Sequence, residues 1–206
     1  MISYLSIDLD YWAVHKDVVK DINHSTRFFR KIKQLNIPMY VVYSHEQLLP
    51  HINENECECL YNIDYHSDIS GYFNVEEKQK WLKKNKPVDG TWAMFVDWRK
   101  KAKFVWRYPD KCCYQLLLGA CWPSDKEDPF KTAKPFNDWK DASHGVGIKG
   151  IDWKNIKAVG IALSSRYVVK ESVYKVLLAL GLLDQKTDIL KKNFDPFFIN
   201  SSCLSL

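Results

Sequence analysis

The stretch CLYNIDYHSD, residues 59–68, joins a short apolar run to three side chains of metal-ligand type. Residues 59–63 have the length and composition of a buried strand. In extended backbone, residues i, i+2 and i+4 point to one face, so Asp64, His66 and Asp68 are predicted to lie together. Buried carboxylates are costly when nothing compensates their charge. We therefore expect a positive group beside this strand end.

Two further strand ends carry side chains of the same kind. The run ISYLSIDLD predicts a strand over residues 2–9 that delivers Asp8 and Asp10 to one face. The run MYVVYSHE predicts a strand over residues 39–43, followed by His45 and Glu46. In open parallel sheets, ligands bind outside the carboxyl ends of the strands. The three clusters are therefore predicted to meet.

The rest of the 206-residue chain alternates between strand and helix patterns. Helices are expected over residues 14–36, 46–55, 75–86 and 171–183, and a strong buried strand over residues 158–163. Residues 91–97 and 103–107 are strand-like, as a hairpin or as two strands of the sheet. Residues 125–150 are predicted to be a long surface loop. The pattern predicts a single α/β domain over residues 1–206, with a three-layer αβα architecture and a mostly parallel sheet.

Charge counting supports a pair of metal ions. Four Asp supply four negative charges, which two divalent cations balance if both His are neutral. Oxygen-rich ligation with a minority of imidazole suits Mn(II) or a similar divalent ion. A pair of such ions about 3.5–4 Å apart can activate a shared water near neutral pH. Structural alternatives stay open, since strand-end acids also cap helices and His45 could follow an N-capping Ser44.

These motifs resemble those of the arginase and ureohydrolase superfamily, which holds two Mn(II) ions. The resemblance implies an arginase-like fold and a two-Mn²⁺ site in which Asp64 and Asp8 bridge the metals; the matching residues are Asp8, Asp10, His45, Asp64, His66 and Asp68. The sequence around the motifs is most similar to a small branch of the superfamily that includes peptide arginases, which convert arginine to ornithine in ribosomally made precursor peptides. The Asp-x-Asp segment precedes Asp-x-His-x-Asp here and comes last in ordinary arginases, which suggests a permuted sheet.

The reaction implied by this resemblance is attack of metal-activated water on a guanidinium carbon, with release of urea. His144 is a candidate proton shuttle, or a His on a surface loop. Glu46 could orient guanidinium or be a first-turn helix acid. Trp92 and Asp97 could stack on and pair with guanidinium, although a core role for Trp92 is the simpler expectation. Glu171 is a further substrate-binding candidate, most simply a helix-start acid.

The bulk composition bounds the remaining alternatives. The net charge is +5 and Lys clusters lie around Trp81 and over residues 99–103, which raises a nucleic-acid-binding alternative. A solvated helix face and a polar turn explain these clusters more simply. The six Cys contain no C-x-x-C pair, so buried free thiols are expected. The N-terminus does not have the pattern of a signal peptide and no apolar run reaches the length of a membrane span, so a cytoplasmic location is expected.

Overall fold

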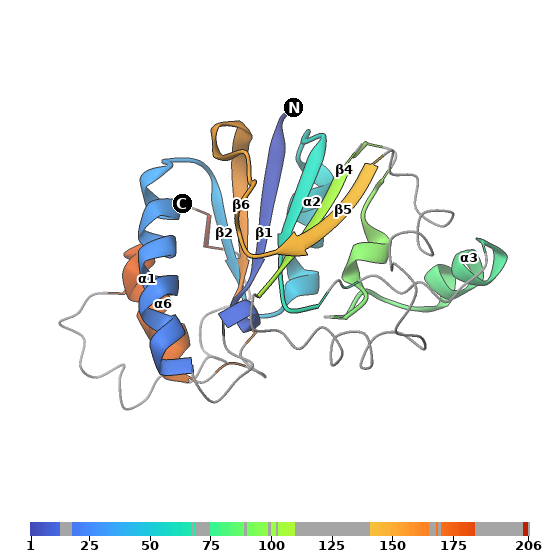
Figure 1. Cartoon of the computed structure of the whole chain (residues 1–206). Coiled ribbons are helices and arrows are strands. Elements are labelled where there is room, and N and C mark those ends of the chain that lie inside the picture. Colours follow the sequence, from blue (N-terminus) through green and yellow to red (C-terminus); the bar gives the residue numbers. More distant parts are fainter. Residues whose placement is uncertain are drawn as a thin grey trace.

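The structure, a computed structural model, has a seven-stranded sheet with helices on both faces (Figure 1). It describes residues 1–12, 18–66, 68, 75–88, 90–98, 100–101, 103–109, 141–164, 168, 170–183 and 204–205. The strand order is β5-β4-β3-β1-β6-β2-β7. Strands β1 to β6 are parallel, and only β7 pairs in the antiparallel sense, with β2. The predicted α/β class with a mostly parallel sheet is confirmed.

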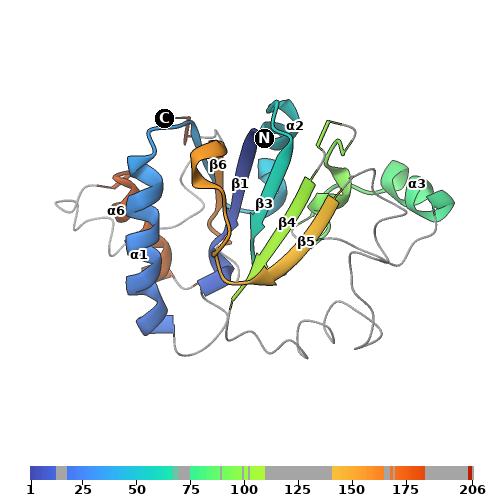
Figure 2. The same cartoon turned by 45° about the horizontal axis from the view of Figure 1, so that its top comes forward.

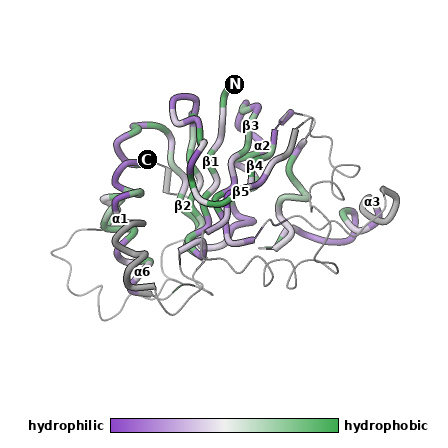
Figure 3. The backbone as a smooth tube through the Cα atoms, in the orientation of Figure 1, coloured by the Kyte–Doolittle hydropathy of each residue, from purple (hydrophilic) through white to green (hydrophobic). Residues whose placement is uncertain are grey.

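The strands form where apolar runs are short and bounded by turns. Their bounds are β1 Ser3–Asp8, β2 Met39–Val42, β3 Cys59–Ile63, β4 Lys103–Tyr108, β5 Asp141–Val146, β6 Ile156–Ala162 and β7 Leu204–Ser205. Strand β1 lies in the middle of the sheet and all six of its residues are buried. Figure 3 shows hydrophobic colour along parts of the central strands.

The helices are α1 Val18–Gln34, α2 Leu49–Glu54, α3 Val75–Lys84 and α6 Lys170–Leu180. Short 3-10 helices lie after β1 (η1 Leu9–Trp12), after β2 (η2 His45–Leu48), between α3 and β4 (η3 Trp92–Phe95) and before β6 (η5 Trp153–Asn155). Figures 1 and 2 show α1 and α6 together at one end of the sheet and α3 beyond its opposite edge.

Two hydrophobic cores lie on the two faces of the sheet. In the first, Leu5 and Ile7 of β1 pack with Phe29 of α1 and Val176 of α6. In the second, Tyr4 of β1 packs with residues of η2, α2 and η3, namely Leu48, Ile52 and Trp92. Alternate residues of β1 therefore serve opposite cores, which gives the three predicted layers.

The handedness of the connections explains which helix covers which face. From β1 the chain passes through α1 to β2, beyond β6; from β2 it passes through α2 back across β1 to β3. Since parallel crossovers are right-handed, connections that travel in opposite directions lie on opposite faces. The direction reverses between β1 and β3. At such a reversal the carboxyl ends of open parallel sheets leave room for a ligand.

Two predictions of secondary structure are wrong. Residues 91–97 are not a strand: residues 92–95 form η3, whose buried Trp92 and Ala93 pack on the second core. Residues 141–146 of the predicted loop form β5, which pairs with β4 along its length. Aromatic content suggested the first strand, and the Gly and Pro content of residues 125–150 concealed the second; residues 125–140 lie outside the described part.

Within the described residues, no helix combines the length and the apolar character needed to cross a bilayer. Cys57 and Cys59 are buried free thiols, as expected. The other four Cys lie outside the described residues.

Candidate metal centre

The acid–His cluster forms where β1 and β3 end side by side. It comprises Asp8, Asp10, His45, Asp64, His66 and Asp68, which the structure brings to one place from three segments of the chain. Ile7 pairs with Ile63, so Asp8 and Asp64 are the next residues of adjacent parallel strands. The predicted convergence of these side chains is therefore present.

Asp8 and Asp64 end their strands with the same local turn. Asp8 Oδ1 accepts a hydrogen bond from the Asp10 amide at 2.9 Å, and Asp64 Oδ1 accepts one from the His66 amide at 2.9 Å. Asp side chains favour such bonds to the backbone two residues on. The prediction assumed extended backbone past Asp64. The backbone there is turned instead, and Asp68 has a φ of 55°.

The turns leave the second oxygen of each carboxylate free to face His45. His45 Nδ1 lies 3.2 Å from Asp8 Oδ2, 3.0 Å from Asp64 Oδ2 and 3.2 Å from Asp68 Oδ2. One N–H can donate well to only one of these oxygens, and like-charged carboxylates repel one another. A metal ion among the four atoms would satisfy all of them.

A second group of donors lies beside the first. Asp10 Oδ2 is 3.3 Å from His66 Nδ1, and Asp10 Oδ1 accepts a hydrogen bond from the Tyr65 amide at 3.4 Å. Two sets of donor atoms could each hold an ion, with all donor atoms in a set within 4.8 Å of one another: Asp8, His45 and Asp64 in one, Asp10, Asp64 and His66 in the other. Asp64 belongs to both sets.

His45 reaches the cluster because η2 packs closely on the sheet. It follows β2, two strands away from β1, with β6 between. Gly160 of β6 faces η2, and a Cβ there would lie 2.7 Å from Leu48 Cδ2 and 2.5 Å from Tyr4 Oη. Only a residue without a side chain lets η2 approach this closely.

Three buried side chains hold the ligands in place. Trp92 Nε1 donates to Asp68 Oδ2 at 2.6 Å, and its ring lies 4.4 Å from the His45 ring. Ser6 Oγ lies 2.6 Å from His45 Nε2, which leaves Nδ1 for the carboxylates. Asn62 Nδ2 donates to Asp64 Oδ2 at 3.4 Å. Such outer contacts orient metal ligands and fix the tautomer of a ligating His.

Ser6 and Asn62 were not predicted as site residues. Each stands two positions before a strand-end Asp and so shares its face. That spacing is the signal that could have identified them.

Protons take the place of cations in the metal-free cluster. Burial and the carboxylates of Asp68 and Asp8 raise the pKa of Asp64 from 3.8 to about 8. Burial, with Asp8 and Asp64, raises the pKa of Asp10 well above its ordinary value.

The pKa values of the two His are raised, although burial alone would lower them. Burial lowers the pKa of His45, but hydrogen bonds with Asp64, Asp68 and Asp8 outweigh it and raise the pKa well above 6.5. Burial also lowers the pKa of His66, but its hydrogen bond with Asp10 and the charges of Asp64 and Asp10 outweigh it and raise the pKa to about 9. No Lys or Arg of the described residues pairs with the four Asp, so within the described part of the chain only protons and the two His offset their charge.

The donor set fits divalent metal. Four carboxylates and two imidazoles, nearly all buried, are ligands for Mn(II) or a similar ion rather than for thiolate-bound zinc. Divalent ions held by these residues would supply a water of lowered pKa, a source of hydroxide near neutral pH.

Trp92 and Asp97 were both predicted to contact guanidinium, and the structure places them in different surroundings. Trp92 is fully buried against the ligands, so it serves them directly and the structure gives it no exposed face for guanidinium. Asp97 lies at the end of η3, where its amide donates to Asn53 Oδ1 at 2.8 Å and its carboxylate lies 3.9 Å from Lys100 Nζ.

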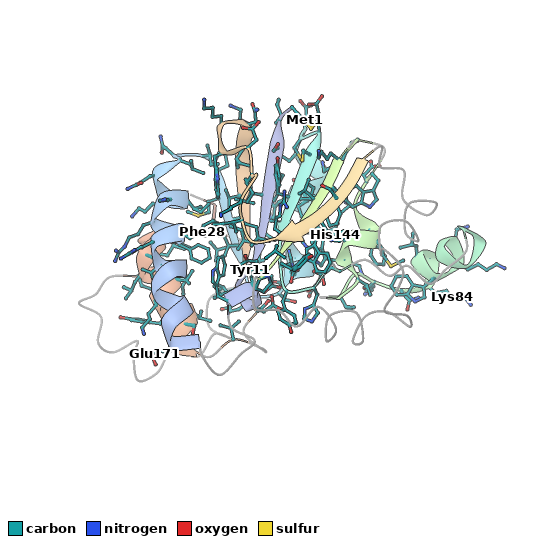
Figure 4. All side chains as sticks on the ribbon, in the orientation of Figure 1. Met1, Tyr11, Phe28, Lys84, His144 and Glu171 are labelled. Atoms are coloured by element: carbon teal, nitrogen blue, oxygen red, sulfur yellow. The ribbon has the colours of Figure 1, made fainter. Side chains whose placement is uncertain are left out.

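Glu46 and Glu171 are both first-turn helix acids. Glu46 is half-buried and accepts a hydrogen bond from Ser44 Oγ. Glu171 is 73% exposed, pairs with Lys175 at 2.8 Å, and lies at the lower end of α6 in Figure 4. The surrounding contacts of both residues match the structural alternative given for each.

His144 lies on β5 rather than on a loop. Its ring lies 6.2 Å from Trp106 and 6.0 Å from Tyr108, on the face of the sheet that carries the second core. Trp106 Nε1 donates to the Asp64 carbonyl at 3.0 Å, so a chain of aromatic contacts links His144 to the cluster.

The Lys-rich segment carries its aromatic residue against the protein. Trp81 of α3 packs on Phe95 of η3 with ring centroids 5.7 Å apart, while Lys80, Lys83 and Lys84 are exposed. This arrangement matches the solvated-face interpretation of that segment.

No family model, curated protein or solved structure matches the chain. The chemistry of the site is therefore argued from its own residues.

Proposed function

We propose that the chain is a dinuclear-metal hydrolase. The observation that carries this proposal is the sharing of Asp64 between two adjacent groups of buried donors. A carboxylate that reaches both groups could serve two cations at once, and paired cations about 3.5–4 Å apart are the arrangement of two-metal hydrolytic sites. A purely structural ion would need only one of the groups.

The proposed reaction is hydrolysis of the guanidinium of a peptidyl arginine, which gives ornithine and urea. It rests on the resemblance of Asp8-x-Asp10 and Asp64-x-His66-x-Asp68 to the arginase motifs, and the proposed partner is an arginine-containing precursor peptide. Two Mn²⁺ are the proposed cofactors. His66 is the most exposed member of the cluster, with 39% of its side chain accessible, so substrate would approach on its side.

The residues of the chain have separable tasks in this proposal. Asp64 and the two His hold the ions, and Trp92 and Ser6 keep the ligand atoms of Asp68 and His45 aimed at them. His144, or a water held near it, is the proposed route for the proton that the leaving amine requires. Glu46 is the proposed second-layer acid behind His45.

The experiment is an assay on protein reconstituted with Mn²⁺ after chelation. A peptide that contains arginine should release urea and lose about 42 Da, the mass of urea less water in a hydrolysis of this class. Asp64→Asn should abolish both signals, and Glu56→Gln, which alters an exposed acid outside the cluster, should leave them unchanged. Free arginine, agmatine and acyl-lysine distinguish related hydrolases. If the protein binds metal but no substrate reacts, the hydrolase proposal is wrong and the metal site stands.

A further inference from the structure

Arg107 presents a half-buried guanidinium that has no hydrogen-bond or ion-pair partner among the described residues. It lies on β4 between Ile63 of β3 and Gly145 of β5. Among the described residues, no hydrogen bond or ion pair involves its side chain, and its Nε is fully buried without an acceptor. A buried N–H that lacks an acceptor is costly, and a charged one more so. The side chain therefore calls for an acceptor from outside the described chain.

Two glycines shape the space around this guanidinium. A Cβ at Gly145 would overlap Arg107 Nη1, and a Cβ at Gly150 would lie 3.2 Å from Nη2. Gly150 has a φ of 85°, so the turn after β5 bends back over the guanidinium in a conformation that favours glycine. A side chain at either position would displace the guanidinium nitrogens. We call the space that Gly145 and Gly150 leave around the Arg107 guanidinium the cradle.

The electrostatic surroundings favour a negative ligand. Lys149 lies exposed in the same turn. The acid of the following segment, Asp152, is exposed and accepts a hydrogen bond from Asn155 at 2.6 Å, and no ion pair joins it to Arg107. A planar guanidinium binds carboxylate and phosphate oxygens through two parallel hydrogen bonds.

The cradle and the acid–His cluster occupy the same end of neighbouring strands. The Asp64 amide donates to the Arg107 carbonyl at 3.0 Å. Arg107 nevertheless follows Val105 on the face of the first core, whereas Trp106 and Tyr108 lie on the face of His45 and Trp92. The guanidinium is thus a feature separate from the metal ligands.

We propose that Arg107, between Gly145 and Gly150, is a binding site for an oxyanion, either a carboxylate or a phosphate. The ligand would accept two hydrogen bonds from the guanidinium and remove the unmatched positive charge. This proposal does not depend on the metal centre or on the hydrolase proposal.

The test is a titration of metal-free protein with sodium phosphate and, separately, with sodium acetate at constant ionic strength. The readout is the ¹H–¹⁵N signal of Arg107 Nε, assigned by its loss in Arg107→Lys. We expect a saturable downfield shift with at least one of the two anions; the anion that binds tighter distinguishes phosphate from carboxylate as the source. If neither anion shifts the signal, the proposal is wrong.

Variants provide an independent check by calorimetry on the same metal-free protein. Arg107→Met and Gly145→Ala should each bind the anion at least about tenfold more weakly, because the first removes the fork and the second displaces it. Arg30→Met, which removes an exposed Arg of α1, should bind as the unaltered chain does. Equal affinity in all three variants would overturn the proposal. Gly145→Ala retains the arginine, so it still provides a result if Arg107→Met does not fold.

Discussion

The two donor groups of the acid–His cluster share Asp64 but differ in their access to water. His45, in the first group, has no exposed side-chain surface, whereas 39% of the His66 side chain is exposed. Trp92 and Ser6 support the first group. The second is supported by backbone amides, including that of Tyr65. In the proposed two-metal site, the first group would hold its ion rigidly and the second would hold an ion where ligands can exchange.

The shared ligand should give the largest effect. Asp64→Asn removes a charge from both groups and weakens the only carboxylate that joins them, so bound metal should fall from about two ions per chain to near zero. Elemental analysis after dialysis against Mn²⁺ measures this, with Glu56→Gln as the control. Two retained ions in Asp64→Asn would show that Asp64 is not a ligand.

The two His should then separate the groups. His66→Ala should lose the exposed ion and keep about one ion per chain, because the His45 group is intact. His45→Ala should lose the buried ion and also lower the melting temperature, since three carboxylates then face one another without an imidazole. His51→Ala, which removes a ring stacked on Tyr40 4.1 Å away, is the control. Loss of both ions in either variant, or retention of both, would mean that the groups do not act separately.

Loss of one supporting hydrogen bond should have a smaller effect. Trp92→Phe keeps an aromatic ring against His45 but removes the donor to Asp68, so affinity for the buried ion should fall about 10–100-fold. Trp98→Phe is a matched control, because Trp98 Nε1 donates to the Ala93 carbonyl rather than to a ligand. Competition with a coloured chelator measures both. Equal affinities would assign Trp92 a packing role alone.

The pH dependence of stability should give the smallest effect. In metal-free protein the pKa of Asp64 is raised from 3.8 to about 8 and that of His66 from 6.5 to about 9. Both groups bind protons more tightly when folded, so their contribution is complete below the unfolded pKa and is lost as pH rises through the folded one.

The melting temperature of metal-free protein should therefore fall as pH rises from about 4, near the unfolded pKa of Asp64, to about 9, the folded pKa of His66. With Mn²⁺ the trend should reverse, because metal displaces these protons and binds more tightly as pH rises. Scanning calorimetry with and without metal checks the sign. A metal-free protein whose stability rises over this range would contradict the account of the cluster.

The strands and helices were predictable because their signals are local. The bounds predicted for β3 from the apolar run before Asp64 match the observed bounds at both ends. The predicted bounds of β1 and β2 differ from the observed ones by no more than one residue at each end. The failures have equally local causes. Trp92 and Phe95 suggested a strand, but a 3-10 turn packed against η2 and α3 buries Trp92 fully and Phe95 in part.

The content of the cluster was predictable, but its geometry was not. Spacing identified five of the side chains and a strand end identified His45, although the backbone past Asp64, assumed to be extended, is a turn. The reach of His45 depends on Gly160, more than a hundred residues away in the chain, and on the position of β6 between β1 and β2. Such long-range contacts leave no pattern in a single sequence.

The paired turns after β1 and β3 make two backbone amides into spectroscopic reporters. The amide of Asp10 donates to Asp8, and that of His66 donates to Asp64, each through the oxygen that does not face His45. Any cation that withdraws charge from one oxygen of a carboxylate weakens the other as an acceptor, so the amide proton resonance should move upfield. Asp10 would then report on Asp8, and His66 on the shared Asp64. The order in which the two signals move during a titration would reveal the order in which ions enter.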